Sequence, residues 1–179
     1  TIYQDVVNRF SGYIGRINPG SLPDQEKIFL ETLRKLSAAG LVGMTHPDSM
    51  INFGSKNALC KLTKNGLVPE DTYVYYDIPD FKKSFPKTLS YGERVLKQNR
   101  GSTGEGIWRI QVEDERPYHP GDVLPLDTKI KCTEAVDNHV EHRQLGEYMN
   151  FCDKYIIGDQ GMLVDMKFLP RIKEGEIRI

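Results

Sequence analysis

A lysine, two hydroxyl residues and three glycines lie close together between residues 95 and 110. These residues are Lys97, Gly101, Ser102, Thr103, Gly104 and Gly106. Glycine lets backbone N–H groups approach an anion closely, and it lets a loop open and shut. The stretch therefore predicts a phosphate-binding loop, with Lys97 placed to add a positive charge.

The glycine spacing excludes the two commonest nucleotide-binding loops. A dinucleotide fingerprint needs G-x-G-x-x-G at the start of a helix, and a Walker loop needs a lysine directly after its last glycine. Here the order is G-x-x-G-x-G followed by Ile107, and apolar runs on both sides indicate a hairpin between two strands. Protein kinases have a similar hairpin, but their phosphate-binding lysine lies on a later strand. A flexible surface hairpin without a ligand is the alternative.

The tip of this hairpin carries no bulky apolar residue between Arg100 and Glu105. We therefore expect the tip to have nothing to pack against and to move as a lid.

Composition predicts a globular chain without a strongly charged partner. The 179 residues are 39% hydrophobic, and 24 Lys+Arg against 25 Asp+Glu give a net charge of -1. This balance gives no reason to expect nucleic acid or an anionic membrane as a partner. No apolar run approaches the roughly 20 residues that span a bilayer, and we recognise no signal peptide, so we expect a cytoplasmic protein.

The cysteines and histidines do not predict a metal site. Cys60, Cys132 and Cys152 are odd in number and far apart, which favours reduced, mostly buried thiols. His139 and His142 lack a cysteine or acidic partner at the spacing typical of metal ligands.

The first part of the chain predicts a strand, a helix and a strand. Residues 13–17 form an apolar run, and a helix from Asp24 to Gly40 leads to a second run over 41–44. This pattern is typical of a βαβ unit from a parallel sheet. A short helix should begin at Pro47, and Ser55 should cap another. That puts Lys56 in a first helical turn, where a lysine is disfavoured unless an anion is near.

The remaining chain predicts alternating strands and helices. The expected strands cover 72–76, 95–96, 107–110, 129–136, 162–168 and a last one from 177, the expected helices cover 80–85 and 141–155, and a proline-bearing loop covers 116–128. Leu145, Tyr148, Met149 and Cys152 share one face of the second helix and should belong to the core.

In this order and spacing, the stretches 47–62, 95–110 and 168–178 resemble the ATP-grasp superfamily, and within it the bacterial glutathione synthetases. The resemblance implies a mixed α/β fold in which an ATP-grasp unit follows the end of a Rossmann-like segment. Residues 1–52 would close that preceding segment, 53–166 would form the lid subdomain, and 167–179 would hold the adenine hinge and start the second subdomain. The chain begins at Thr1 and ends within an expected strand, so we expect a fragment.

The resemblance also implies roles for individual residues. Lys56 and Lys97 would grip the triphosphate of ATP beneath the glycine loop. Phe168, Leu169 and Pro170 would form the adenine-binding hinge, and Lys167 just before it would also contact the cofactor. Glu176 would bind the ribose, with Glu174 as the reserve choice, and Arg178 would offset charge on the transferred phosphoryl group. Asp165 and Glu174 flank the hinge, where they fit ribose contact or solvent.

The implied reaction is ATP-dependent ligation of a carboxylate to an amine through an acyl phosphate, with Mg²⁺ as cofactor. The family's metal ligands would lie downstream of Ile179, so this piece alone should not turn over ATP. The stretch 111–165 is longer than in glutathione synthetases, with an extra strand inserted, so neither substrate carries over. Two alternatives remain, a non-catalytic nucleotide-binding module and a phosphotransferase that acts on a non-carboxylate substrate. Homo-oligomerisation is left open.

Overall fold

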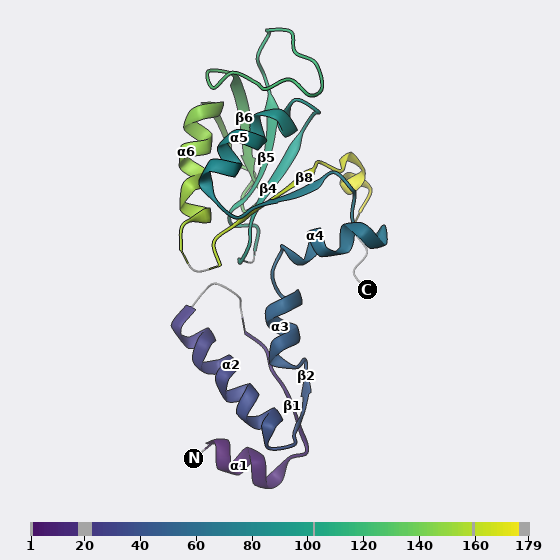
Figure 1. The fold of residues 1–179 in the computed structure, drawn as a ribbon, viewed down its shortest axis with the longest axis vertical. Helices are drawn as coiled ribbons and strands as arrows, with labels where there is room; N and C mark the ends of the chain where they lie inside the picture. Colours follow the sequence, from purple (N-terminus) through teal and green to yellow (C-terminus); the bar gives the residue numbers. More distant parts are fainter. Residues whose placement is uncertain (1, 18–22, 102, 159, 176–179) are drawn as a thin grey trace.

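The computed structural model describes residues 2–17, 23–101, 103–158 and 160–175 of the chain. Two groups of elements follow one another along it (Figure 1). The N-terminal group consists of α1 (Ile2–Arg9), β1 (Gly12–Ile14), α2 (Pro23–Ala38), β2 (Val42–Met44) and α3 (Pro47–Phe53). The second group consists of α4 (Ala58–Leu62), η1 (Thr63–Asn65), β3 (Thr72–Tyr75), α5 (Ile78–Leu89), β4 (Arg94–Gln98), β5 (Ile107–Val112), β6 (Lys129–Glu134), β7 (Val140–Gln144), α6 (Leu145–Ile156), β8 (Leu163–Lys167) and η2 (Pro170–Glu174).

The N-terminal group is built on a βαβ unit, as the sequence predicts. β1 and β2 pair in parallel, with Tyr13 opposite Gly43, and α2 connects them. Leu33 and Leu36 of α2 are buried together with Leu41, and half-buried side chains of α1 pack on this cluster. The parallel pair thus has α2 packed against one face.

The second group holds a six-stranded antiparallel sheet within the described residues. Its strand order is β3-β8-β4-β5-β6-β7, and every neighbouring pair is antiparallel. The predicted hairpin is confirmed, since Lys97 of β4 lies opposite Ile107 of β5. β8 inserts between β3 and β4, so residues far apart in sequence meet in the middle of the sheet.

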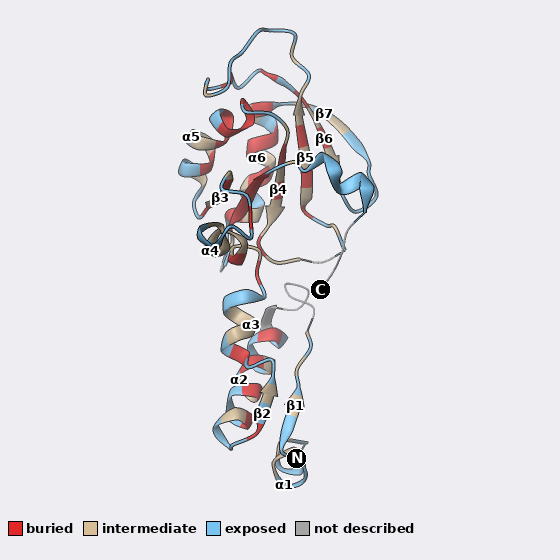
Figure 2. Ribbon diagram, turned by 90° about the vertical axis from the view of Figure 1, so that its right-hand side faces the viewer, coloured by how far each residue is buried: buried red, intermediate tan, exposed pale blue. Residues whose placement is uncertain are grey.

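The main core lies between this sheet and the two helices α5 and α6. Figure 2 shows buried residues where these helices face the strands. The predicted face of α6 is confirmed, because each of its four residues is at most 2% exposed: Leu145, Tyr148, Met149 and Cys152. Each large apolar side chain buried in this way contributes about 1.5–3 kcal/mol. Cys132 and Cys152 are free thiols in this core, and Cys60 is a half-buried free thiol.

Two expected elements have other boundaries in the structure. The helix expected over 141–155 begins as β7, which pairs with β6, and α6 starts only at Leu145. Exposed and half-buried residues alternate along β7, as in a strand with one covered face. Most of its side chains are polar or charged on both faces, so the sequence shows no alternation of apolar and polar residues. The helix expected over 80–85 is longer, because Asp77 caps it by accepting a hydrogen bond from the N–H of Asp80 at 2.8 Å.

The expected cap at Ser55 is wrong. The Ser55 hydroxyl donates to the side-chain oxygen of Asn57 at 2.6 Å, and α4 begins only at Ala58. Lys56 therefore precedes the helix and does not lie in its first turn. No helix in the described part of the chain is long and apolar enough to cross a membrane.

A buried ion pair joins the central strands. Asp165 of β8 is fully buried and accepts hydrogen bonds from Arg94 at 2.6 Å and from the hydroxyls of Tyr75 and Thr88 at 2.7 Å. Arg94, 1% exposed, also donates to Asp71 at 2.6 Å. The expectation that Asp165 contacts ribose or solvent is therefore wrong, because strand pairing places its side chain beside Leu96, on the face of the sheet that α5 and α6 cover.

Asp165→Asn should lower the free energy of unfolding by roughly 3–5 kcal/mol, because it leaves a buried guanidinium with only the half-exposed Asp71 as counter-charge. Urea denaturation measures this change. The matched control is Asp127→Asn, which breaks the surface pair of Arg116 and should leave stability nearly unchanged. Equal effects of the two substitutions would show that the buried pair does not stabilise the sheet.

Candidate functional site

The glycine loop joins β4 to β5 at one end of the sheet. The N–H of Gln98 donates to the carbonyl of Gly106 at 2.9 Å and closes the loop. Gly104 and Gly106 have φ values of +91° and +64°, a region that other residues adopt at a cost. A Cβ on Gly104 would lie 2.9 Å from the carbonyl carbon of Ala135, in the turn between β6 and β7. The expectation that the tip has nothing to pack against is therefore wrong.

Lys56 lies against this loop, although it is 45 positions away from Gly101 in the sequence. Its Nζ donates to the Gly101 carbonyl at 3.0 Å, and its backbone N–H donates to the Asn99 carbonyl at 3.1 Å. Burial lowers the pKa of Lys56, and the positive charge of Lys97 lowers it further. The two lysines singled out in the sequence thus lie close enough to repel each other.

Asn99 is a residue of this site that the sequence analysis missed. Its side-chain oxygen accepts a hydrogen bond from the N–H of Asn57 at 3.1 Å, and its side-chain amide donates to the Gln160 carbonyl at 3.2 Å. Its backbone N–H donates to the Met162 carbonyl at 3.1 Å. Asn99 thereby holds the Lys56 segment and the start of β8 against the glycine loop. An asparagine in a polar loop gives no sequence signal for such a role, because its partners are remote in the chain.

Glu134 at the end of β6 is a second residue that was missed. Its Oε1 accepts a hydrogen bond from the N–H of Gly106 at 2.9 Å. The backbone N–H of Ala135, the residue after Glu134, donates to the carbonyl of Ile107 at 2.9 Å. The Gly106 amide is thus already used by a carboxylate of the chain itself, and Glu134 ties the glycine loop to the end of β6.

Lys97 and Arg109 lie on the sheet face opposite α5 and α6. Their strand neighbours Leu96 and Trp108 are buried beneath those helices, and successive side chains along a strand point to opposite faces. The Arg109 guanidinium lies 3.9 Å from the centre of the Phe168 ring. Arg109 is paired with Glu93 at 2.6 Å, so its charge on this face is already compensated.

The expected hinge directly follows β8. Lys167 is the last residue of β8, Phe168 and Leu169 come next, and Pro170 begins η2. The N–H of Phe168 donates to the Glu93 carbonyl at 2.9 Å, so that donor is already used. An adenine edge would have to be read by the Leu169 amide and by the hinge carbonyls.

Three of the expected site residues, Ser102, Glu176 and Arg178, lie outside the described residues. Glu174, the reserve choice for ribose, belongs to η2 and accepts a hydrogen bond from exposed Arg171 at 2.8 Å. Of the other expected residues, the structure brings Lys56, Lys97 and the glycine loop together.

The histidines near the β6–β7 turn face carboxylates. His139 Nδ1 lies 2.5 Å from Asp137, and His142 Nδ1 lies 2.7 Å from Glu113. Hydrogen bonding to Asp137 raises the pKa of the exposed His139. Among the residues that the structure describes, no group of three or more His, Cys, Asp or Glu side chains is arranged to hold a metal ion.

Gly104→Ala should destabilise the protein more than Gly40→Ala does. The two glycines have φ values of +91° and +92°, but a Cβ on Gly40 would meet no atom within 4 Å. The backbone strain is therefore matched, and the difference isolates the contact with Ala135. Thermal unfolding of both variants is the measurement, and equal shifts in Tm would show that the loop does not rest on the β6–β7 turn.

No protein-family model matches the chain, and no curated protein matches it either. The function of the chain is therefore inferred from the geometry around Lys56, Lys97 and the glycine loop.

Proposed function

We propose that the chain contains the ATP-binding part of an ATP-dependent carboxylate–amine ligase with an ATP-grasp fold. The observation that carries the proposal is the position of Lys56 against the glycine loop, where its Nζ donates to the Gly101 carbonyl at 3.0 Å and its pKa is lowered by the charge of Lys97. An antiparallel hairpin with a lysine on its entering strand supports the same proposal.

Electrostatics favour an anion between these lysines. A half-buried ammonium beside a second positive charge is unfavourable, and a triphosphate would relieve both the desolvation and the repulsion. A phosphate oxygen is also a stronger acceptor than the Gly101 carbonyl, because charge-assisted hydrogen bonds are about twice as strong as neutral ones.

The reaction proposed here places specific demands on the chain. ATP transfers its γ-phosphoryl group to a carboxylate, and an amine then displaces phosphate from the resulting acyl phosphate. Positive charge must offset the charge on the transferred group, which Lys56 and Lys97 would do. Water must be excluded because acyl phosphates hydrolyse, and the glycine loop would cover the site.

Magnesium would supply further charge neutralisation to such a reaction when bound. The described residues give no ligand set for it, so each role assigned here belongs to protein groups. Phe168 of the proposed hinge would border the adenine together with Arg109, whose guanidinium lies 3.9 Å from the centre of its ring.

Lys97→Ala and Lys56→Ala should each weaken ATP binding by roughly 1–3 kcal/mol, the scale for losing one charge-assisted hydrogen bond. Isothermal titration calorimetry measures the affinities. The control is Lys129→Ala, an exposed lysine on β6 of the same sheet, which should bind ATP like the parent chain. Unchanged affinity in both test variants would remove the basis of the proposal.

As the pH rises, ATP affinity should begin to fall at a lower pH than it would if Lys56 had the pKa of an ordinary lysine. Lys56 is protonated below its pKa, and that pKa is lowered, so its positive charge is lost earlier as the pH rises. Lys56→Arg should extend tight binding to higher pH, because a guanidinium stays protonated. Titrations at increasing pH measure this, and an identical pH profile for the two proteins would contradict the role of Lys56.

A phosphate-release assay with Mg²⁺, ATP and panels of carboxylates and amines, run on a version extended past Ile179 beside the 179-residue chain, separates the ligase from its alternatives. The 179-residue chain alone should release no phosphate, so the extended version decides between them. Release that requires both a carboxylate and an amine supports a ligase. Binding of ATP without release indicates a nucleotide-binding module, and transfer to a non-carboxylate acceptor indicates a phosphotransferase.

A further inference from the structure

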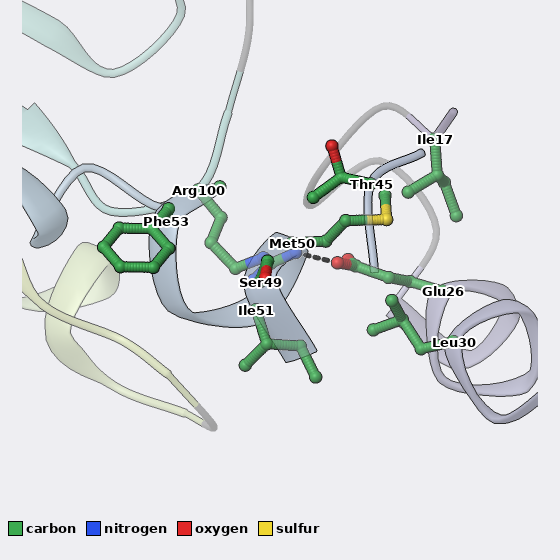
Figure 3. Close-up of a pocket in the computed structure, with 10 residues that line it drawn as sticks. Ile17, Glu26, Leu30, Thr45, Ser49, Met50, Ile51, Phe53 and Arg100 are labelled. Carbon is green, nitrogen blue, oxygen red and sulfur yellow. Dashed lines mark ion pairs between the residues drawn. The ribbon is translucent and has the colours of Figure 1, made fainter. Parts of the chain in front are cut away.

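A cavity of about 360 Å³ lies at the carboxyl ends of the parallel strands β1 and β2. Ile17 follows β1 and Thr45 follows β2, and both line the cavity (Figure 3). In open α/β structures, small ligands bind in the crevice outside the carboxyl ends of the strands. The volume falls near the lower end of the range for small-molecule sites, about 300–1,000 Å³.

An ion pair crosses this cavity. Glu26 reaches in from α2 and Arg100 from the segment before the glycine loop, and Figure 3 shows the two side chains meeting. Their side chains are only 10% and 15% exposed. Arg100 also donates to the side-chain oxygen of Gln160 at 2.9 Å, and burial lowers the pKa of its guanidinium.

The rest of the cavity wall is mainly apolar. Leu30 of α2 and Met50 and Ile51 of α3 contribute aliphatic side chains. Ser49 adds a hydroxyl group from the same helix. A ligand that fits this wall therefore carries an apolar group beside its charges.

We propose that this cavity binds a small zwitterion with an apolar side chain, of the α-amino acid class. An ammonium group would pair with Glu26, and a carboxylate would pair with Arg100. Such a ligand replaces the existing pair with two new ones and leaves no charge unpaired in a largely buried site. A ligand with one charge would strand either Glu26 or Arg100, which is strongly unfavourable.

The charges that line this cavity distinguish it from the proposed triphosphate site. A polyanion would be repelled by Glu26, whereas Lys56 and Lys97 bring positive charge to the glycine loop. The cavity is adjacent to the proposed triphosphate site. Gly54 and Arg100 line the cavity, and Lys56 and Gly101, which contact each other, follow them closely in the sequence. Binding of a zwitterion does not require ATP, so it can be measured without nucleotide.

The first test titrates the 179-residue chain with L-leucine, L-methionine and L-phenylalanine by calorimetry. At least one of the three should bind, and its N-acetyl and amide derivatives, which lack the positive and the negative charge respectively, should each bind at least about tenfold more weakly. No binding of any of the three, or equal binding of the capped derivatives, would overturn the proposal.

The second test uses Glu26→Gln, which leaves Arg100 as the only charge of the pair. The variant should lose affinity for the amino acid and gain affinity for its N-acetyl derivative, because a monoanion now satisfies Arg100. A destabilised variant would gain nothing, so this exchange distinguishes recognition from misfolding. Glu31→Gln, at an exposed position of α2, is the matched control and should behave like the parent chain. Failure of Glu26→Gln to gain affinity for the N-acetyl derivative would contradict the assignment.

Discussion

The buried pair between Arg94 and Asp165 determines how the central strands of the sheet meet. Arg94 lies on β4 and Asp165 on β8, while Tyr75 of β3 contributes a third hydrogen bond. Two buried charges are tolerated only when their geometry is satisfied, so a shift in register between these strands would leave both unpaired. The pair therefore favours one register for β3, β8 and β4.

That register also places the candidate site. Lys97 is three residues after Arg94 on β4, so its side chain lies on the opposite face, away from the helices and on the same face as Arg109. Phe168 of the proposed hinge comes three residues after Asp165, and its ring lies against Arg109 on that same face. A constraint inside the core thus positions groups on the face of the sheet opposite α5 and α6.

Local patterns in the sequence predicted much of the fold. The βαβ unit and the hairpin at Lys97 follow from apolar runs and turn residues, and both are confirmed. β7 was missed because its charged residues hide the alternation of a strand. The burial of Asp165 could not be foreseen, since it depends on β8 inserting between β3 and β4.

The same distinction holds for the candidate site. Lys56 and Lys97 could be singled out from residue type and position, but their approach depends on Asn99, which joins segments near 57, 99 and 160. Glu134 could not be singled out from the sequence, because its contact with Gly106 depends on the pairing of β5 with β6. Long-range hydrogen bonds of this kind become visible only when the strand order is known.

The central claim is that Lys56 and Lys97 share one triphosphate site. Chemical acetylation of the chain with and without ATP, read out residue by residue by mass spectrometry, tests it most directly. We predict that ATP protects Lys56 and Lys97 together and leaves the exposed Lys129 as reactive as before. Protection of neither lysine, or equal protection of Lys129, would contradict a shared site at the glycine loop.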